Sequence, residues 1–194
     1  MVMTNTPEYV SLIGIDPGST HLGISVMRVD PINWKIINTR AKTIHAQKLI
    51  DLDSDLVIYH GEKIARIRLI CQKLYTLFQY ERPIAVASES PFYSQRRPSA
   101  FGVLTEVIDG VRDAVYQYNS LLPLTLIDPP TVKKAVGAPG NADKLVVKNF
   151  VKMSPIINYA GDTPIDLLDE HSIDSIAVNF AQFTLMEKQL CLRN

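Results

Sequence analysis

The sequence has few cysteines, no net charge and no long hydrophobic run, and each shortage excludes a class of protein. Cys71 and Cys191 lie 120 positions apart and belong to no CxxC motif. We therefore expect reduced, buried thiols in place of a disulfide framework or a zinc site. No apolar run reaches the roughly 18 residues of a membrane span, and the first nine residues are too polar for a signal peptide. These features predict a cytoplasmic protein without a membrane partner.

What the sequence does contain is typical of one globular domain. It has 194 residues, and roughly 150 residues per domain predicts a single unit over residues 1–194. Hydrophobic residues make up 46% and charged residues 21%, which is ordinary for a chain with a buried core. No internal repeat or low-complexity tract interrupts it.

The zero net charge is the sum of basic segments and acidic segments that cancel each other. Lys plus Arg and Asp plus Glu each number 20, which removes the usual whole-chain argument for a nucleic-acid partner. However, residues 128–153 carry five lysines against two aspartates, residues 62–82 carry five bases against two acids, and residues 161–174 hold five acids and no base. Metal-binding acids beside phosphate-binding bases would produce such a balance.

The hydrophobic pattern predicts an α/β fold. Apolar stretches ended by turn residues predict strands over 11–16, 23–29, 34–45, 84–89 and 124–128. Helical periodicity predicts helices over 62–78, 98–118, 130–136, 142–153 and 166–187. The order of three strands, helix, strand, helix, strand and helices suits a mixed five-stranded sheet flanked by helices, the ribonuclease H-like order. The pattern alone leaves a flavodoxin-like alternative open.

Two acidic residues stand where predicted strands end. Asp16 closes the first strand before Pro17-Gly18, and Glu89 closes the fourth just before Ser90-Pro91. Carboxylates on neighbouring strand ends repel each other unless a cation lies between them, so the pair indicates a metal site. The alternatives are that Asp16 only opens the Asp-Pro-Gly turn and that Glu89 is a surface acid.

A third acidic cluster begins the last predicted helix. Asp166, Asp169 and Glu170 fit a helix N-terminus, where acids interact favourably with the helix dipole. Asp174 fits less well because it lies in an apolar stretch. His171 and Asp174 are three residues apart and share a helix face, from which they could bind one cation. A lone helix histidine is also commonly a cap or a surface residue.

Basic residues concentrate before and within the helix predicted at 142–153. Lys133 and Lys134 precede a glycine-bearing loop that leads into it, a combination that favours phosphate binding. At intervals of four residues the helix carries a basic stripe, opposite an apolar set: Lys144, Lys148 and Lys152 against Val146, Phe150 and Met153. A solvated helix face is the ordinary explanation of such a stripe.

Jointly, these motifs resemble those of the RuvC-type Holliday junction resolvases over nearly the whole chain. The matching segments are Ile-Asp-Pro-Gly-Ser at 15–19, Glu89 with an aromatic residue three positions on, the block from Val-Lys-Lys at 132–134 to Ala-Asp-Lys at 142–144, and His-Ser-Ile-Asp-Ser-Ile-Ala at 171–177. The resemblance implies a ribonuclease H-like nuclease domain over 1–194 that acts as a homodimer on four-way DNA junctions. A phage member of the family would act in the host cytoplasm.

The resemblance also implies roles for individual residues. Its metal-binding and catalytic positions fall on Asp16, Glu89, His171 and Asp174, with Lys144 as a further catalytic residue near the scissile phosphate. His171 departs from the aspartate that most relatives have there, and Glu170 or Asp169 is an alternative ligand. Two Mg²⁺ ions, replaceable by Mn²⁺, are implied as cofactors. The implied DNA-binding residues are Phe92, Tyr93, Arg96, Arg97, Lys133, Lys134 and Lys148.

A two-fold dimer would present two identical sites to a four-way junction and make paired, symmetric nicks. The helix at 98–118 offers two apolar stripes for this, one made of residues 104, 108, 111 and 115 and the other of 103, 107, 110 and 114. We expect one stripe to face the sheet and the other a partner helix; the alternative is that both lie in the core.

Three other functions compete with junction resolution. One is a relaxed ribonuclease H-like nuclease on branched DNA or RNA:DNA hybrids, and another is a catalytically silent junction-binding module. The third is an actin-like ATPase, which begins with a similar Asp-x-Gly turn. No second glycine-rich phosphate loop supports it.

Overall fold

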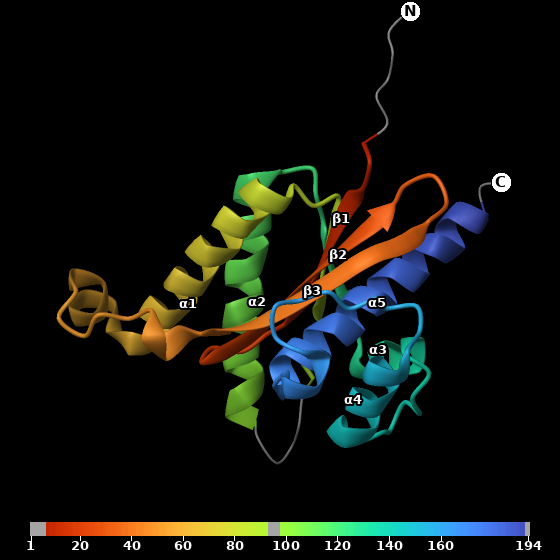
Figure 1. Ribbon diagram of the computed structural model, residues 1–194. Coiled ribbons are helices and arrows are strands. Elements are labelled where there is room, and N and C mark those ends of the chain that lie inside the picture. The colour runs from red at the N-terminus through yellow and green to blue at the C-terminus, as the bar shows by residue number, and fades with distance from the viewer. Residues whose placement is uncertain (1–6, 93–97, 193–194) are drawn as a thin grey trace, which may run out of the picture.

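A computed structural model describes residues 7–92 and 98–192 of the chain, and their centre is a mixed five-stranded sheet (Figure 1). The strands are β1 (Val10–Asp16), β2 (His21–Asp30), β3 (Lys35–His45), β4 (Ala85–Glu89) and β5 (Leu124–Ile127), in the order β3-β2-β1-β4-β5. β1 pairs antiparallel with β2 and parallel with β4. The predicted fold class is confirmed, and the antiparallel pairing excludes the flavodoxin-like alternative.

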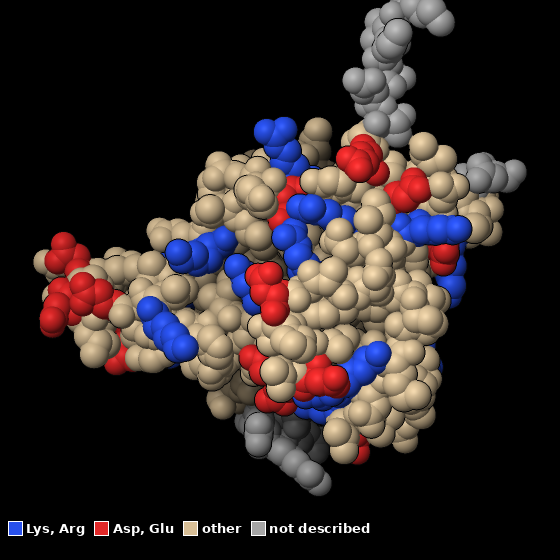
Figure 2. Space-filling model, viewed as in Figure 1, with Lys and Arg blue, Asp and Glu red and all other residues tan. Residues whose placement is uncertain are grey.

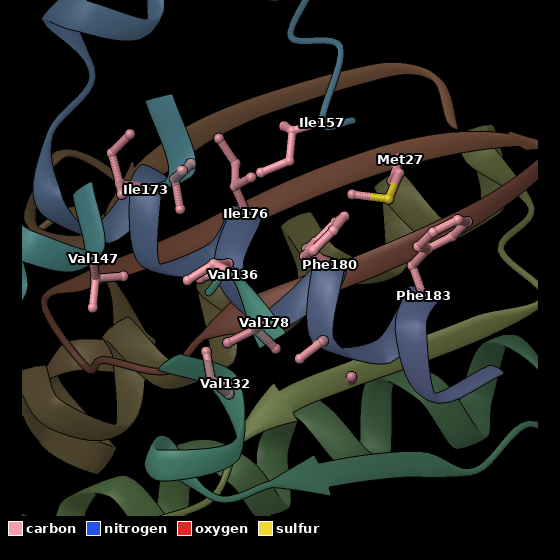
Figure 3. Close-up of a cluster of buried hydrophobic side chains, with 14 of the residues drawn as sticks. Met27, Val132, Val136, Val147, Ile157, Ile173, Ile176, Val178, Phe180 and Phe183 are labelled. Atoms are coloured by element: carbon pink, nitrogen blue, oxygen red, sulfur yellow. The ribbon is translucent and has the colours of Figure 1, made fainter. Parts of the chain in front are cut away.

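Helices cover both faces of this sheet. They are α1 (Asp55–Glu81), α2 (Pro98–Tyr118), α3 (Pro129–Ala135), α4 (Lys144–Met153) and α5 (Glu170–Cys191). On one face α1 and α2 pack on alternate residues of β1, Ile13 and Ile15. On the other face α5, with α3 and α4 beside it, buries Ile173, Ile176 and Phe180 (Figure 3). Leu12 of β1 belongs to the same cluster. Because β1 is buried on both faces, its sequence is almost continuously apolar.

The first and the last helix begin furthest from their predicted starts. Asp169 is the N-cap of α5, and its side chain accepts a hydrogen bond from the backbone N–H of Ser172, so the helix begins at residue 170. α1 begins at Asp55, well before residue 62, and Gly61 interrupts it with a φ of 78°. Its first turns hold exposed apolar side chains, which hides the helical period there. None of the described helices has both the length and the apolar character of a membrane span.

The expectation that one stripe of α2 faces a partner helix is wrong. Val107, Ala114, Val111 and Val115, drawn from both stripes, are all buried in the core between the sheet and the two helices. α1 packs against the small-residue stripe of α2. A Cβ added at Gly110 in this stripe would lie 2.7 Å from the Sγ atom of Cys71 in α1. Small residues therefore serve close packing of α1 on α2 within the chain.

The buried face of α4 is not the one that carries Phe150 and Met153. Val147 and Val151 are buried, whereas Phe150 is 40% and Met153 81% exposed. The helix rolls this way because it packs against the start of α5. Consequently Lys148 lies beside the buried face, where its Nζ donates to the Leu168 carbonyl at 3.0 Å.

The two cysteines are free thiols, as expected, but only one is shielded. Cys71 packs between α1 and α2, and burial raises its pKa to about 11. Cys191 is exposed at the end of α5, so the expectation that it is buried is wrong.

Gly23 lets α5 approach the sheet beside the strand end at Asp16. A Cβ added there would lie 2.0 Å from the His171 carbonyl oxygen, which is backbone and cannot swing aside. We expect Gly23→Ala to lower the free energy of unfolding by about 1–3 kcal/mol and to displace His171. Chemical denaturation measures this change. The matched control is Gly102→Ala in α2, where a Cβ meets nothing within 4 Å and should stabilise the helix slightly. Equal effects of the two substitutions would contradict the expectation.

Candidate active site

Asp16 and Glu89 come together at one edge of the sheet. β1 and β4 run parallel with Ile15 opposite Ser88, so the next residue of each strand is an acid at the same end. Asp16 is only 9% exposed, and Glu89 is half-buried. The prediction from strand ends therefore places both carboxyl groups correctly, with the Pro17 turn and the Ser90-Pro91 segment leading the chain away.

α5 brings His171 and Asp174 to the same place. The His171 Nδ1 atom lies 2.8 Å from the Asp16 Oδ2 atom, and the carboxylate accepts this hydrogen bond. The bond raises the pKa of His171, because the nearby negative charge favours the imidazolium form. With Nδ1 held by Asp16, Nε2 is the ring atom that remains for another ligand.

The carboxyl groups carry negative charge that the chain only partly compensates. Burial raises the pKa of Glu89 to about 7, and the charges of Asp16 and Asp174 add to the effect. Burial likewise raises the pKa of Asp174 to about 6, with Asp16 again contributing. Groups whose environments push their pKa values this far are typical of functional sites.

Two lysines border the acids. Lys144 Nζ lies 2.8 Å from a Glu170 oxygen and 3.5 Å from the Asp174 Oδ2 atom. Lys133 Nζ donates to the Ala142 carbonyl at 2.7 Å, which ties the loop after α3 to the site. A cavity of about 190 Å³ opens between these elements, lined by Glu89, Pro129, Val132, Lys133, Lys144, Val147, Asp174 and Ala177.

The donor set suits a hard divalent cation. Carboxylate oxygens and one imidazole are ligands that Mg²⁺ or Mn²⁺ accepts. A cation would offset the repulsion from Asp16 and Asp174, which adds to the effect of burial on the pKa of Glu89. Across residues 7–92 and 98–192, however, no group of three or more His, Cys, Asp or Glu side chains is arranged so that it could hold a metal ion as it stands. Metal binding by these residues therefore needs side-chain adjustment and stays a prediction.

The alternative ligands Asp169 and Glu170 have other partners. Asp169 caps α5 and also accepts a hydrogen bond of 2.6 Å from the Thr43 hydroxyl. Glu170 is largely exposed and pairs with Lys144. His171 is the residue of this segment that contacts Asp16, which favours it over both neighbours.

The predicted DNA-binding residues differ in how exposed their side chains are and in whether they already have a partner within the chain. Phe92, in the segment after β4, is 70% exposed, and Lys134 is exposed on α3. Lys148 is held by the Leu168 carbonyl. Tyr93, Arg96 and Arg97 lie outside the described residues.

Sequence reasoning missed His21. Its ring stacks on that of His171, with centroids 5.5 Å apart and planes 7° from parallel. The signal was available, because the hairpin of the first two strands returns the chain beside Asp16 and His21 begins the second strand.

The fold and the site define a class of protein, a ribonuclease H-like domain with an acidic centre where β1 and β4 end. Residues 12–179 match the family model described as crossover junction endodeoxyribonuclease RuvC. The chain therefore belongs to the RuvC family, whose nucleases depend on a metal ion.

Individual relatives agree with this assignment. The crossover junction endodeoxyribonuclease RuvC of Synechocystis sp. is 25% identical over 187 residues, covering 92% of this chain and 94% of the relative. That of Xanthomonas oryzae pv. oryzae is 28% identical over 158 residues, 81% of each chain. Among solved structures, Thermus thermophilus RuvC superposes with a TM-score of 0.66 at 22% identity, covering 92% of this chain and 97% of the other. Yeast mitochondrial Holliday junction resolvase Ydc2 superposes at 0.58, with 12% identity, 97% of this chain and 87% of the other covered.

Proposed function

We propose that the protein resolves four-way DNA junctions by cutting phosphodiester bonds at the site of Asp16, Glu89, His171 and Asp174. The observation that carries the proposal is the convergence of three buried or half-buried carboxyl groups, two of them with strongly raised pKa values, in a chain of the RuvC family. Relatives of this family are crossover junction endodeoxyribonucleases, and one solved relative is a complex with a Holliday junction substrate.

Each site residue has a task in this proposal. Asp16, Glu89 and Asp174 would hold two Mg²⁺ ions, with His171 contributing through Nε2 or orienting Asp16. Two such ions, when bound, activate the attacking water and neutralise the leaving 3′ oxygen. Lys144 adds positive charge beside the phosphate, and Lys133 holds the loop that borders it. Lys144 must first leave Glu170, a largely exposed pairing that costs little to break.

Paired nicks require two sites. We propose that the domain over residues 1–194 works as a homodimer, since a two-fold axis matches the symmetry of a four-way junction. The surface that joins the copies is not the small-residue stripe of α2, which packs on α1. The reaction belongs in the cytoplasm where DNA is available, or in the host cytoplasm if the chain is encoded by a phage.

A junction assay with a metal titration tests the proposed function. We expect paired nicks in a synthetic four-way junction that depend on Mg²⁺ and persist with Mn²⁺, whereas linear duplex and RNA:DNA hybrid of the same sequence stay uncut. Equal cutting of hybrid or forked DNA would instead support the relaxed nuclease. Binding without cleavage in either metal would support the silent module.

A further inference from the structure

A groove outside the acidic centre runs between α1 and the edge strand β3. This α1–β3 groove has a volume of about 570 Å³ and is lined by Lys42, Thr43, Ile44, His45, Lys48, Leu49, Lys73, Thr76, Leu77 and Tyr80. None of these residues is acidic. Figure 2 shows several Lys and Arg side chains on this side of the molecule, between α1 and β3, with a few Asp and Glu side chains among them.

The three lysines of the groove have free positive charge. Within the part of the chain that the structure describes, no carboxylate lies within ion-pair distance of Lys42, Lys48 or Lys73. The α4 lysines differ, because Lys144 pairs with Glu170 and Lys152 pairs with Asp166. Lys42, Lys48 and Lys73 are therefore available to an external anion, whereas these two α4 lysines must first leave their acidic partners.

The groove continues along β3 into a second hollow. This hollow, of about 360 Å³, shares Lys42, Leu77 and Tyr80 with the groove and adds Arg40. Two acids also line it. Glu81 is paired with Arg28 and Arg40, so its charge is compensated, whereas Asp162 is exposed at the rim. The basic surface is thus strongest in the α1–β3 groove itself.

At its other end the groove adjoins the acidic centre. His45 lines the groove, and its ring lies edge-on to that of His21 with centroids 5.1 Å apart. His21 in turn stacks on His171, which holds Asp16. Thr43, another lining residue, donates to Asp169 at the start of α5. A strand bound at the acids could therefore pass directly into the groove.

We infer that the α1–β3 groove binds the phosphate backbone of one duplex arm of the junction cut at the acidic centre. The inference rests on the proposed function and adds where the uncut part of the substrate lies. Lysine side chains neutralise phosphates without reading sequence, so this contact positions the DNA and releases counterions. The lining offers three ammonium groups and two threonines, side chains of the kind that contact phosphate oxygens, beside aliphatic side chains and the rings of His45 and Tyr80.

The salt dependence of junction binding tests the groove. The test variant replaces Lys42, Lys48 and Lys73 by glutamine. The control variant makes the same charge change with Lys35, Lys63 and Lys188, which lie outside the groove. With binding measured without divalent metal, each lost phosphate contact reduces the slope of log K against log salt by about 1. We expect the test variant to lose about 3 from that slope and the control variant to keep the wild-type value. Thermal unfolding of both variants checks that the fold persists.

Photo-cross-linking from the groove identifies which part of the junction DNA lies in it. Thr76→Cys in a Cys191→Ser background puts one reactive thiol in the groove, because the Cys71 thiol is partly buried and its pKa is raised to about 11. A photoactivated label on that thiol should join to the duplex arm. Cross-links confined to the crossover, or equal salt slopes in the two lysine variants, would overturn the inference while wild-type cleavage leaves the proposed function intact. A wild-type protein that neither binds nor cuts junctions would refute the proposed function instead.

Discussion

Asp16→Asn is expected to abolish cleavage of a four-way junction while the junction stays bound. Asparagine keeps the shape of the side chain, and its amide oxygen still accepts the hydrogen bond from His171. It cannot supply the negative charge that a divalent cation needs. Loss of one preorganised electrostatic group typically lowers kcat by about 100- to 1,000-fold, and we expect at least this loss. Single-turnover cleavage and a binding titration measure the two properties separately.

Asp166→Asn is the matched control for this substitution. It makes the same chemical change in the same acidic segment, but Asp166 is exposed and pairs with Lys152 away from the Asp16 carboxylate. The control should cut at the wild-type rate. Equal cleavage by the Asp16 variant and the wild type would show that the catalytic site lies elsewhere.

Glu89→Gln is expected to stabilise the metal-free protein at pH 8 although it abolishes cleavage. The folded-state pKa of Glu89, about 7, lies above its ordinary value of 4.5. The folded state therefore binds the proton more tightly, and this stability is present below about pH 4.5 and lost as the pH rises through 7. At about 1.4 kcal/mol per pKa unit, the loss is on the order of 3 kcal/mol. Glutamine stays neutral at every pH, so the variant does not lose this stability when the pH rises.

Denaturant unfolding with a chelator present measures whether the free energy of unfolding falls or rises with pH. Between pH 5 and pH 8 the wild type should lose stability and Glu89→Gln should lose less, the remainder coming from Asp174 and His171, whose pKa values are also raised. Mg²⁺ added at pH 8 should stabilise the wild type more than the variant. Glu187→Gln, an exposed residue of α5, is the control. A pH dependence identical in the wild type and Glu89→Gln would contradict the raised pKa of Glu89, to which burial contributes most and the charges of Asp16 and Asp174 add.

The acids of the site were predictable because their signals are local. Asp16 and Glu89 each end a short buried strand just before a proline, so strand ends can be located without knowing the fold. Asp174 interrupts an apolar helix face and thereby indicates a use other than solvation. How His171 and Asp16 contact each other could not be predicted, because 155 positions separate them and the close approach of α5 at Gly23 sets their distance.

The predictions that failed concern which surfaces meet. On α2 the pattern identified buried residues correctly but assigned one stripe to a partner, whereas α1 covers it. On α4 the pattern indicated that the lysines face solvent, whereas residues of α5 and of the segment before it pair with them. Periodicity reports that a side chain avoids water and contains no information about which element excludes the water.

The sequence by itself determined the order of strands and helices, the strand ends that carry Asp16 and Glu89, and the unlike charge of separate segments, because each follows from short-range pattern and turn chemistry. Only the tertiary structure decided which charges remain free. Packing of α4 against the start of α5 uses the lysines that looked available, and the pairing of β3 beside α1 brings Lys42, Lys48 and Lys73 together without an acid. The physical reason is that charge pairing acts over a few ångströms in space, a distance that only the folded chain defines.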